Sequence, residues 1–182
     1  MVQPALSVSR EEQSAHITCM SPPNHQEGNT MFEISVNNNK DLTLTGKKFL
    51  YYSNPLLAHI EPNSGFVIEG NVVTIKGRGF IEGTTCICTF RDIQSPKVTF
   101  VSFTTILCIV PPIRLTNEEL EVSVQISNNG INLAPSKVSY MYRSFPIAYD
   151  IFPAKVNSDG STVCEIKGKH LSGAKSCRFG VF

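Results

Sequence analysis

The sequence predicts an all-β protein built from antiparallel β-sandwiches in tandem. Apolar and polar residues alternate with a period of two, glycine- and asparagine-rich turns separate strand-length runs, and the pattern recurs after about 90 residues. The alternation is clearest in residues 119–127, where Leu120, Val122, Val124 and Ile126 alternate with polar side chains. We expect these four side chains to be buried on one strand, and no stretch of the chain favours a helix.

Segments of the chain recur in the same order. "ITCMSPP" at residues 17–23 is repeated as "ILCIVPP" at residues 106–112, 89 positions later. A proline pair cannot continue a β-ladder, so both copies predict a strand that ends at the same place. We also match "FEISVNNN" at residues 32–39 with "LEVSVQISNNG" at residues 120–130.

A third pair of segments, "VTIKGRGF" from Val73 and "CEIKGKHL" from Cys164, keeps the offset of the copies between 89 and 91 residues. The register predicts three parts: residues 1–53 as the C-terminal half of a first unit, 54–143 as a complete unit, and 144–182 as the N-terminal part of a third. A half-unit leaves one face uncovered. We expect a longer polypeptide, or in the less favoured alternative residues 144–182 of a neighbouring molecule, to supply the missing strands.

The complete unit resembles a known family. "IEPNSGFVIEGNVVTIKGRGFIEGTTCICTF", followed by "TTILCIVPP", is similar to the IPT/TIG repeat of plexins, scatter-factor receptors and some transcription factors. The resemblance implies tandem immunoglobulin-like sandwiches of the E-set type. It covers the whole chain but is weaker in residues 144–182, which lack a counterpart of Gly65 and have Leu171 where the pattern has phenylalanine. The residues that carry it are Ile60, Pro62, Gly65, Gly70, Val73, Thr74, Ile75, Gly77, Phe80, Ile106, Cys108, Pro111 and Pro112.

The repeat sorts the six cysteines into positions. Cys88 shares one position with Cys177, and Cys108 shares another with Cys19. We therefore expect Cys88 and Cys108 to form a pair within the complete unit, as a disulfide or as two buried thiols, whereas the mates of Cys19 and Cys177 are absent with their half-units. The cysteines without a counterpart are Cys86 and Cys164.

Two observations favour a reducing compartment. Cys86 and Cys164 would be left over, and an unpaired thiol is unusual in a secreted protein. The asparagine-rich chain also contains no Asn-x-Ser/Thr acceptor for glycosylation. The family resemblance points the other way, because it implies ectodomains more often. An extracellular or cell-surface location is slightly favoured over an intracellular one in the cilium or cytoskeleton, and both stay open.

Composition argues against several functions. The 16 Lys+Arg and 15 Asp+Glu residues leave a net charge of +1, too little to attract nucleic acid, and the apolar runs are too short to span a membrane. Cys86 and Cys88 with Cys108 fit no zinc spacing. We predict no catalytic residue, no cofactor, no metal site, and no nucleic-acid or membrane contact.

The units are joined almost without a linker, by "YYSNP" at residues 51–55 and "YRSFP" at residues 142–146. Phe145 and Phe152 are candidates for packing between units, although each could instead fill the core of its own unit. These features favour a non-enzymatic structural or adhesion segment of a larger multi-repeat protein, a semi-rigid spacer or scaffold that binds neighbouring repeats and other proteins. The alternatives are a dimerisation module of a transcription factor and an intracellular ciliary or cytoskeletal scaffold.

Overall fold

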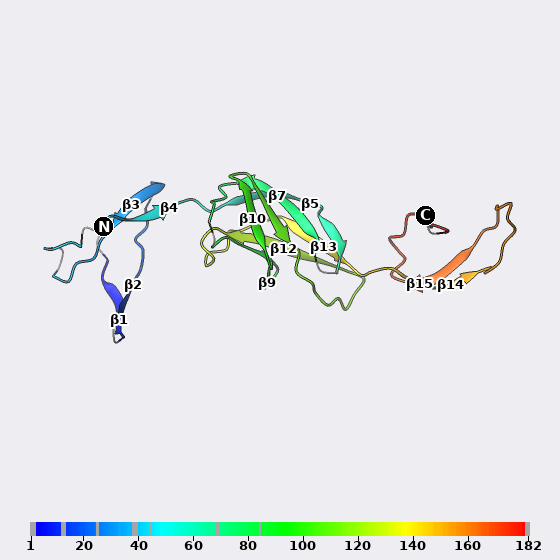
Figure 1. The fold of residues 1–182 in the computed structure, drawn as a ribbon, viewed down its shortest axis with the longest axis horizontal. Coiled ribbons are helices and arrows are strands. Elements are labelled where there is room, and N and C mark those ends of the chain that lie inside the picture. Colours follow the sequence, from blue (N-terminus) through cyan, green and yellow to red (C-terminus); the bar gives the residue numbers. More distant parts are fainter. Residues whose placement is uncertain are drawn as a thin grey trace. The chain divides into compact units, whose positions relative to one another are not determined.

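The computed structural model shows a chain whose secondary structure is entirely strand in the described residues, with no helix, which confirms the all-β prediction. The chain divides into two units, Met1–Ser53 and Asn54–Phe182, and we describe each by itself (Figure 1). The structure describes residues 3–11, 14–24, 26–37, 40–43, 45–67, 70–83 and 85–180.

The first sheet of the second unit has four antiparallel strands. Its inner strands form the longest continuous ladder, in which Ile75 lies opposite Ile106 and Val73 opposite Cys108. Their β-branched residues suit this position, because both faces of an inner strand are crowded by neighbouring side chains. In spatial order the strands are β10 (Val98–Ser102), β11 (Thr105–Ile109), β7 (Val72–Arg78) and β5 (Leu56–Glu61).

The second sheet has five strands, and one pair of them is parallel. In spatial order they are β6 (Ser64–Phe66), β13 (Ser139–Arg143), β12 (Glu119–Ser127), β8 (Ile87–Phe90) and β9 (Ile93–Gln94). Strand β6 runs parallel to β13, with the amide of Met141 donating to the carbonyl of Asn63 at 2.9 Å and that of Val67 to Arg143 at 3.1 Å. Because these early and late strands run in the same direction, the chain enters and leaves this sandwich at opposite ends (Figure 1).

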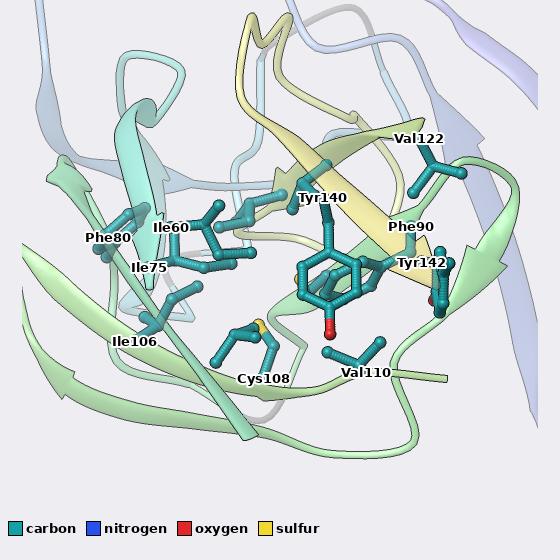
Figure 2. Close-up of a cluster of buried hydrophobic side chains, with 14 residues drawn as sticks. Ile60, Ile75, Phe80, Phe90, Ile106, Cys108, Val110, Val122, Tyr140 and Tyr142 are labelled. Atoms are coloured by element: carbon teal, nitrogen blue, oxygen red, sulfur yellow. The ribbon is translucent and has the colours of Figure 1, made fainter. Parts of the chain in front are cut away.

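The two sheets enclose one hydrophobic core (Figure 2). On β12, Val122, Val124 and Ile126 are buried and Leu120 is partly buried against them, because alternate side chains of a strand point to one face. Edge-to-face aromatic contacts fill the centre, with ring centroids 5.5 Å apart for Phe90 and Tyr140. The buried cluster consists of Ile60, Val73, Ile75, Phe80, Cys88, Phe90, Ile106, Cys108, Val110, Val122, Val124, Ile126, Tyr140 and Tyr142.

A tyrosine hydrogen bond ties the last strand of this sandwich to the end of β11. The buried hydroxyl of Tyr142 donates to the carbonyl of Pro111 at 2.8 Å. The same bond recurs in the first unit, where the hydroxyl of Tyr51 donates to the carbonyl of Pro22 at 3.0 Å. The proline pair thus ends the strand and supplies an acceptor in both copies.

The first unit consists of two separate hairpins. Strand β1 (Ala5–Arg10) pairs with β2 (Ala15–Cys19), and β3 (Gly28–Phe32) pairs with β4 (Lys47–Tyr51). All described residues of β1, β2 and β3 are exposed.

The register in the first unit corrects one of the sequence matches. Thr30 lies opposite Phe49, as Val122 lies opposite Tyr140. The hydroxyl of Ser35 donates a hydrogen bond to the side chain of Asn37. In the central unit, the hydroxyl of Ser127 donates in the same way to Asn129. Ser35 therefore corresponds to Ser127, 92 residues later, and the match of "FEISVNNN" with "LEVSVQISNNG" was wrong, because the connection after the proline pair is shorter in the first unit.

The last hairpin, β14 (Ile147–Phe152) with β15 (Glu165–Lys169), reproduces β5 with β7. Ile151 lies opposite Ile166 as Ile60 lies opposite Ile75, and both hairpins contain an irregularity at the same place. The second strand of each hairpin requires a glycine at the equivalent position. A Cβ atom at Gly77 would collide with the carbonyl of Leu56, and a Cβ atom at Gly168 would collide with the carbonyl of Ile147.

Candidate interaction surface and core thiols

Cys88 on β8 and Cys108 on β11 lie in the core, each with 0% of its surface exposed. Burial raises the pKa of the Cys88 thiol, and a side-chain hydrogen bond with Cys108 raises it further. Figure 2 shows Cys108 among the aliphatic side chains of the core. All six cysteines lie in the described part of the chain and are free thiols, so a disulfide between these two stays a prediction.

Cys86 joins this pair, which the repeat did not indicate. Its thiol is partly buried against the core, and burial, followed by the nearby Cys108, raises the pKa of Cys86 to about 11. The thiolate is the reactive form of cysteine, so a raised pKa keeps the Cys86 and Cys88 thiols protonated and unreactive at neutral pH. This chemistry suits packing rather than nucleophilic catalysis.

Cys19 and Cys177 have the opposite environment. Both are exposed, although they occupy the positions of the buried Cys108 and Cys88 in the repeat. Cys19 ends β2, and Cys177 follows the last hairpin outside any strand.

A hydrophobic hollow lies where the sandwich of residues 54–143 meets the last hairpin. Phe145 belongs to the three-residue connection between β13 and β14, and its ring packs edge to face on Phe66 with centroids 5.1 Å apart. Phe152, at the end of β14, is 69% exposed. The hollow has a volume of about 390 Å³ and is lined by Val67, Ile113, Arg114, Leu115, Ser144, Phe145, Ile147 and His170.

Polar contacts at Glu118 hold the same hairpin. Its carboxylate accepts a hydrogen bond from the hydroxyl of Ser172 at 2.9 Å and lies 3.6 Å from Nδ1 of His170. Its backbone carbonyl accepts from the amide of Ser144 at 2.8 Å. Glu118 is separated from these partners by about fifty positions, so the sequence gives no periodic signal that could reveal the contact.

The flanking segments expose apolar residues in groups. Residues 3–53 and 145–180 each present several large hydrophobic side chains to solvent, more than the isolated surface residues that are common on folded proteins. These side chains include Ile17, Met31, Phe49, Ile151, Val163 and Phe179.

The described residues contain no group of three or more histidine, cysteine, aspartate or glutamate side chains that could hold a metal ion. The described residues also contain no helix that is long and apolar enough to cross a membrane.

Two packed sheets, antiparallel except for the pairing of β6 with β13 and closed by a tyrosine bond to the end of β11, define residues 54–143 as an immunoglobulin-like β-sandwich. Residues 55–142 match the family described as "IPT/TIG domain". Residues 55–142 therefore form an IPT/TIG domain. This family and this fold are typically non-enzymatic.

The chain is similar to fibrocystin-L of Mus musculus, with 32% identity over 127 residues. That alignment covers 70% of this chain but 3% of the relative. Among solved structures, the chain resembles the extracellular region of plexin A4, domains 1 to 10, with a TM-score of 0.50, 21% identity, and coverage of 83% of this chain and 13% of the other. At that identity the likeness establishes the fold alone.

Proposed function

We propose that the chain is a non-enzymatic structural segment in which consecutive IPT/TIG units act as a semi-rigid spacer and bind other proteins. In this proposal residues 54–143 form the complete unit, and residues 1–53 and 144–182 are parts of its neighbours. The similarity to fibrocystin-L, of which the alignment covers 3%, supports a role within a longer protein.

The observation that carries the proposal is the direct attachment of the last hairpin to the sandwich. Only three residues separate β13 from β14, and one of them, Phe145, packs on Phe66. The contacts of Glu118 with Ser172 and His170 add a second point of attachment. Two separate contacts across a short connection restrict bending, as a stiff spacer requires. Packing by Phe152 against a further unit stays part of the proposal.

Nuclear magnetic resonance relaxation tests this stiffness. In the wild-type chain, the amides of β14 and β15 should report the same rotational correlation time as those of β12. Phe145→Ala should lower the correlation time of the hairpin alone, because the ring contact with Phe66 is lost. Phe103→Ala removes an aromatic ring that is 72% exposed on the same sandwich and serves as the control. Independent tumbling of the wild-type hairpin would contradict the proposal.

A further inference from the structure

Strand β10 forms an open edge of the four-stranded sheet. In the described residues it pairs with β11 alone. The strand belongs to the sandwich of residues 54–143, in which both sheets are present, so this edge is a feature of a closed core and not of the flanking segments. An open edge presents backbone donors and acceptors that another strand can use.

The other three edges of this sandwich are less suited to pairing. Strand β9 has two residues and β6 has three. Strand β5 ends in Glu61 and contains an irregularity between Leu57 and His59. Short strands, charges and irregularities are the usual means by which proteins block edge pairing. Residues 98–109, which form β10, its turn and β11, contain no charged side chain, so β10 is the least protected edge.

The ladder with β11 shows which backbone groups of β10 are free. The amide of Ile109 donates to the carbonyl of Lys97 at 3.0 Å. Hydrogen bonding alternates along an antiparallel strand, so the backbone groups of Thr99 also face β11. The N–H and C=O groups of Val98 and Phe100 therefore point to the open edge.

The side chains at this edge are also incompletely covered. Val98 and Phe100 pack against the hydrophobic core but are only partly buried, since β10 has no neighbour on this side. Val101, on the outer face of the same strand, is 54% exposed. A strand added here would cover apolar surface as well as bind the free backbone groups.

We propose that β10 pairs with β10 of a second copy of the chain, antiparallel and about a two-fold axis at Thr99. The irregularity between Phe100 and Ser102 ends the regular part of the strand, so the outward-pointing groups are those of Val98 and Phe100. One register pairs all of them: Val98 of each copy lies opposite Phe100 of the other, and Thr99 lies opposite Thr99. The two four-stranded sheets then form one continuous sheet.

A second copy is the occupant because this edge is complementary to itself. The two-fold axis presents each free donor of one strand to a free acceptor of the other. It also brings no like charges together, since Lys97 lies opposite Val101 and the rest of the hairpin is uncharged. A charged partner strand would find no counter-charge in residues 98–109. The pairing goes beyond the proposed spacer role and does not depend on it.

The corresponding edge of the first unit is not equivalent. Strand β1 pairs with β2 as β10 pairs with β11, but it contains an irregularity between Ala5 and Ser7 and ends in Arg10. Both features oppose edge pairing. The proposed contact is therefore specific to the sandwich of residues 54–143.

Sedimentation equilibrium of the 182-residue chain tests the pairing. The contact is small, so we expect a weak dimer whose mean mass rises between about 10 µM and about 1 mM protein. Thr99→Lys should raise the dissociation constant about tenfold or more, because it places like charges opposite one another. Val72→Lys is the matched control, since Val72 is 52% exposed on the same face but lies on β7, beyond β11. A monomer at every concentration, or equal loss in both variants, would overturn the proposal.

The opposite charge provides a rescue test of the two-fold axis. Thr99→Glu alone should weaken association as Thr99→Lys does. An equal mixture of the two variants should associate at least as strongly as the wild-type chain, because a glutamate then lies opposite a lysine. If the mixture stayed as weak as its components, Thr99 would not face Thr99 and the proposal would fail.

Amide exchange identifies the strand that pairs. The amides of Val98 and Phe100 should become more protected as the protein concentration rises, because each gains a carbonyl acceptor, whereas Thr99 is bonded to β11 at every concentration. Unchanged exchange in β7, β11 and β12 verifies that each variant is folded. Exchange at Val98 and Phe100 that does not vary with concentration would exclude pairing through β10.

Discussion

Strands β2 and β11 carry nearly the same sequence but have opposite surroundings. In β11, Ile106 and Cys108 are both 0% exposed, because β7 covers one edge and the second sheet covers one face. In β2, Ile17 is 42% exposed and Cys19 is exposed as well. The local sequence therefore determines that a strand forms and where it ends. Burial depends on whether the rest of the unit is present.

The hairpins β5–β7 and β14–β15 extend the comparison. They share their register, the position of the irregularity and the glycine on the second strand, yet only the first lies under a second sheet. Local pairing is thus conserved between the two copies, and the difference between them is in packing. Four predictions test this separation.

Amide exchange should give the largest difference. In a dilute solution of the chain, amides of β7, β11 and β12 should exchange about a thousandfold or more slowly than those of β1 to β4, because only the former open with the unfolding of a complete core. Mass spectrometry after timed exchange and peptide digestion measures this. Equal protection along a dilute monomer would contradict the comparison.

The second largest difference should be the loss of stability when the equivalent isoleucines of β11 and β2 are truncated. Ile106→Ala should destabilise the central unit by about 3 to 4 kcal/mol, since it leaves a cavity in a packed core. Ile17→Ala should change its stability by less than about 0.5 kcal/mol. Denaturation followed by tyrosine fluorescence is suitable because the chain has no tryptophan and Tyr140 and Tyr142 are buried. Similar losses in both variants would show that β2 is covered in solution.

Removing the hydroxyl groups of the equivalent tyrosines should give a smaller difference in unfolding free energy. Tyr142→Phe should cost about 1 to 2 kcal/mol of unfolding free energy, because it leaves the carbonyl of Pro111 without its buried donor. Tyr51→Phe should leave the stability of the central unit unchanged, since its bond to Pro22 lies in the other unit. Equilibrium denaturation of the two variants makes the measurement, and a stable Tyr142→Phe protein would argue against the role of this bond.

Alkaline pH should have the smallest effect, and it should be confined to the central unit. Burial raises the pKa of the Cys86 thiol from 9.0 to about 11 and also raises the pKa of Cys88. The folded state holds these protons more tightly than the unfolded state, so the stability they contribute is complete below pH 9 and is lost as pH rises toward the folded-state values. The melting temperature should therefore fall between pH 9 and pH 11, and less steeply in Cys86→Ala; equal slopes would exclude a contribution from this thiol.

Much of the fold could be predicted from the sequence because it depends on local patterns. The alternation in β12 predicted that Val122, Val124 and Ile126 are buried, and the glycine-bounded "VTIKG" segment indicated an IPT/TIG unit. The register of β3 could not be predicted in this way. Matching letters favoured the wrong alignment, and only the pairing of Thr30 with Phe49 showed the shorter connection.

The contacts of the last hairpin could not be predicted from the sequence, for a different reason. Glu118 meets Ser172 and His170 through tertiary structure, and neither a strand period nor a turn rule relates residues so far apart. The packing of a third thiol, Cys86, against the core was missed because the repeat has no counterpart for this residue. Its partial burial follows from the position just before β8.

The parallel pairing of β6 with β13 has a mechanical consequence. Tension applied through the two ends of the central sandwich pulls these strands along their axes in opposite directions. The hydrogen bonds from Met141 to Asn63 and from Val67 to Arg143 then carry the load together in shear, whereas bonds at the end of a hairpin would open one after another. We therefore expect the central unit to resist extension until this short pair ruptures as a whole, and to lose its remaining strands at lower force.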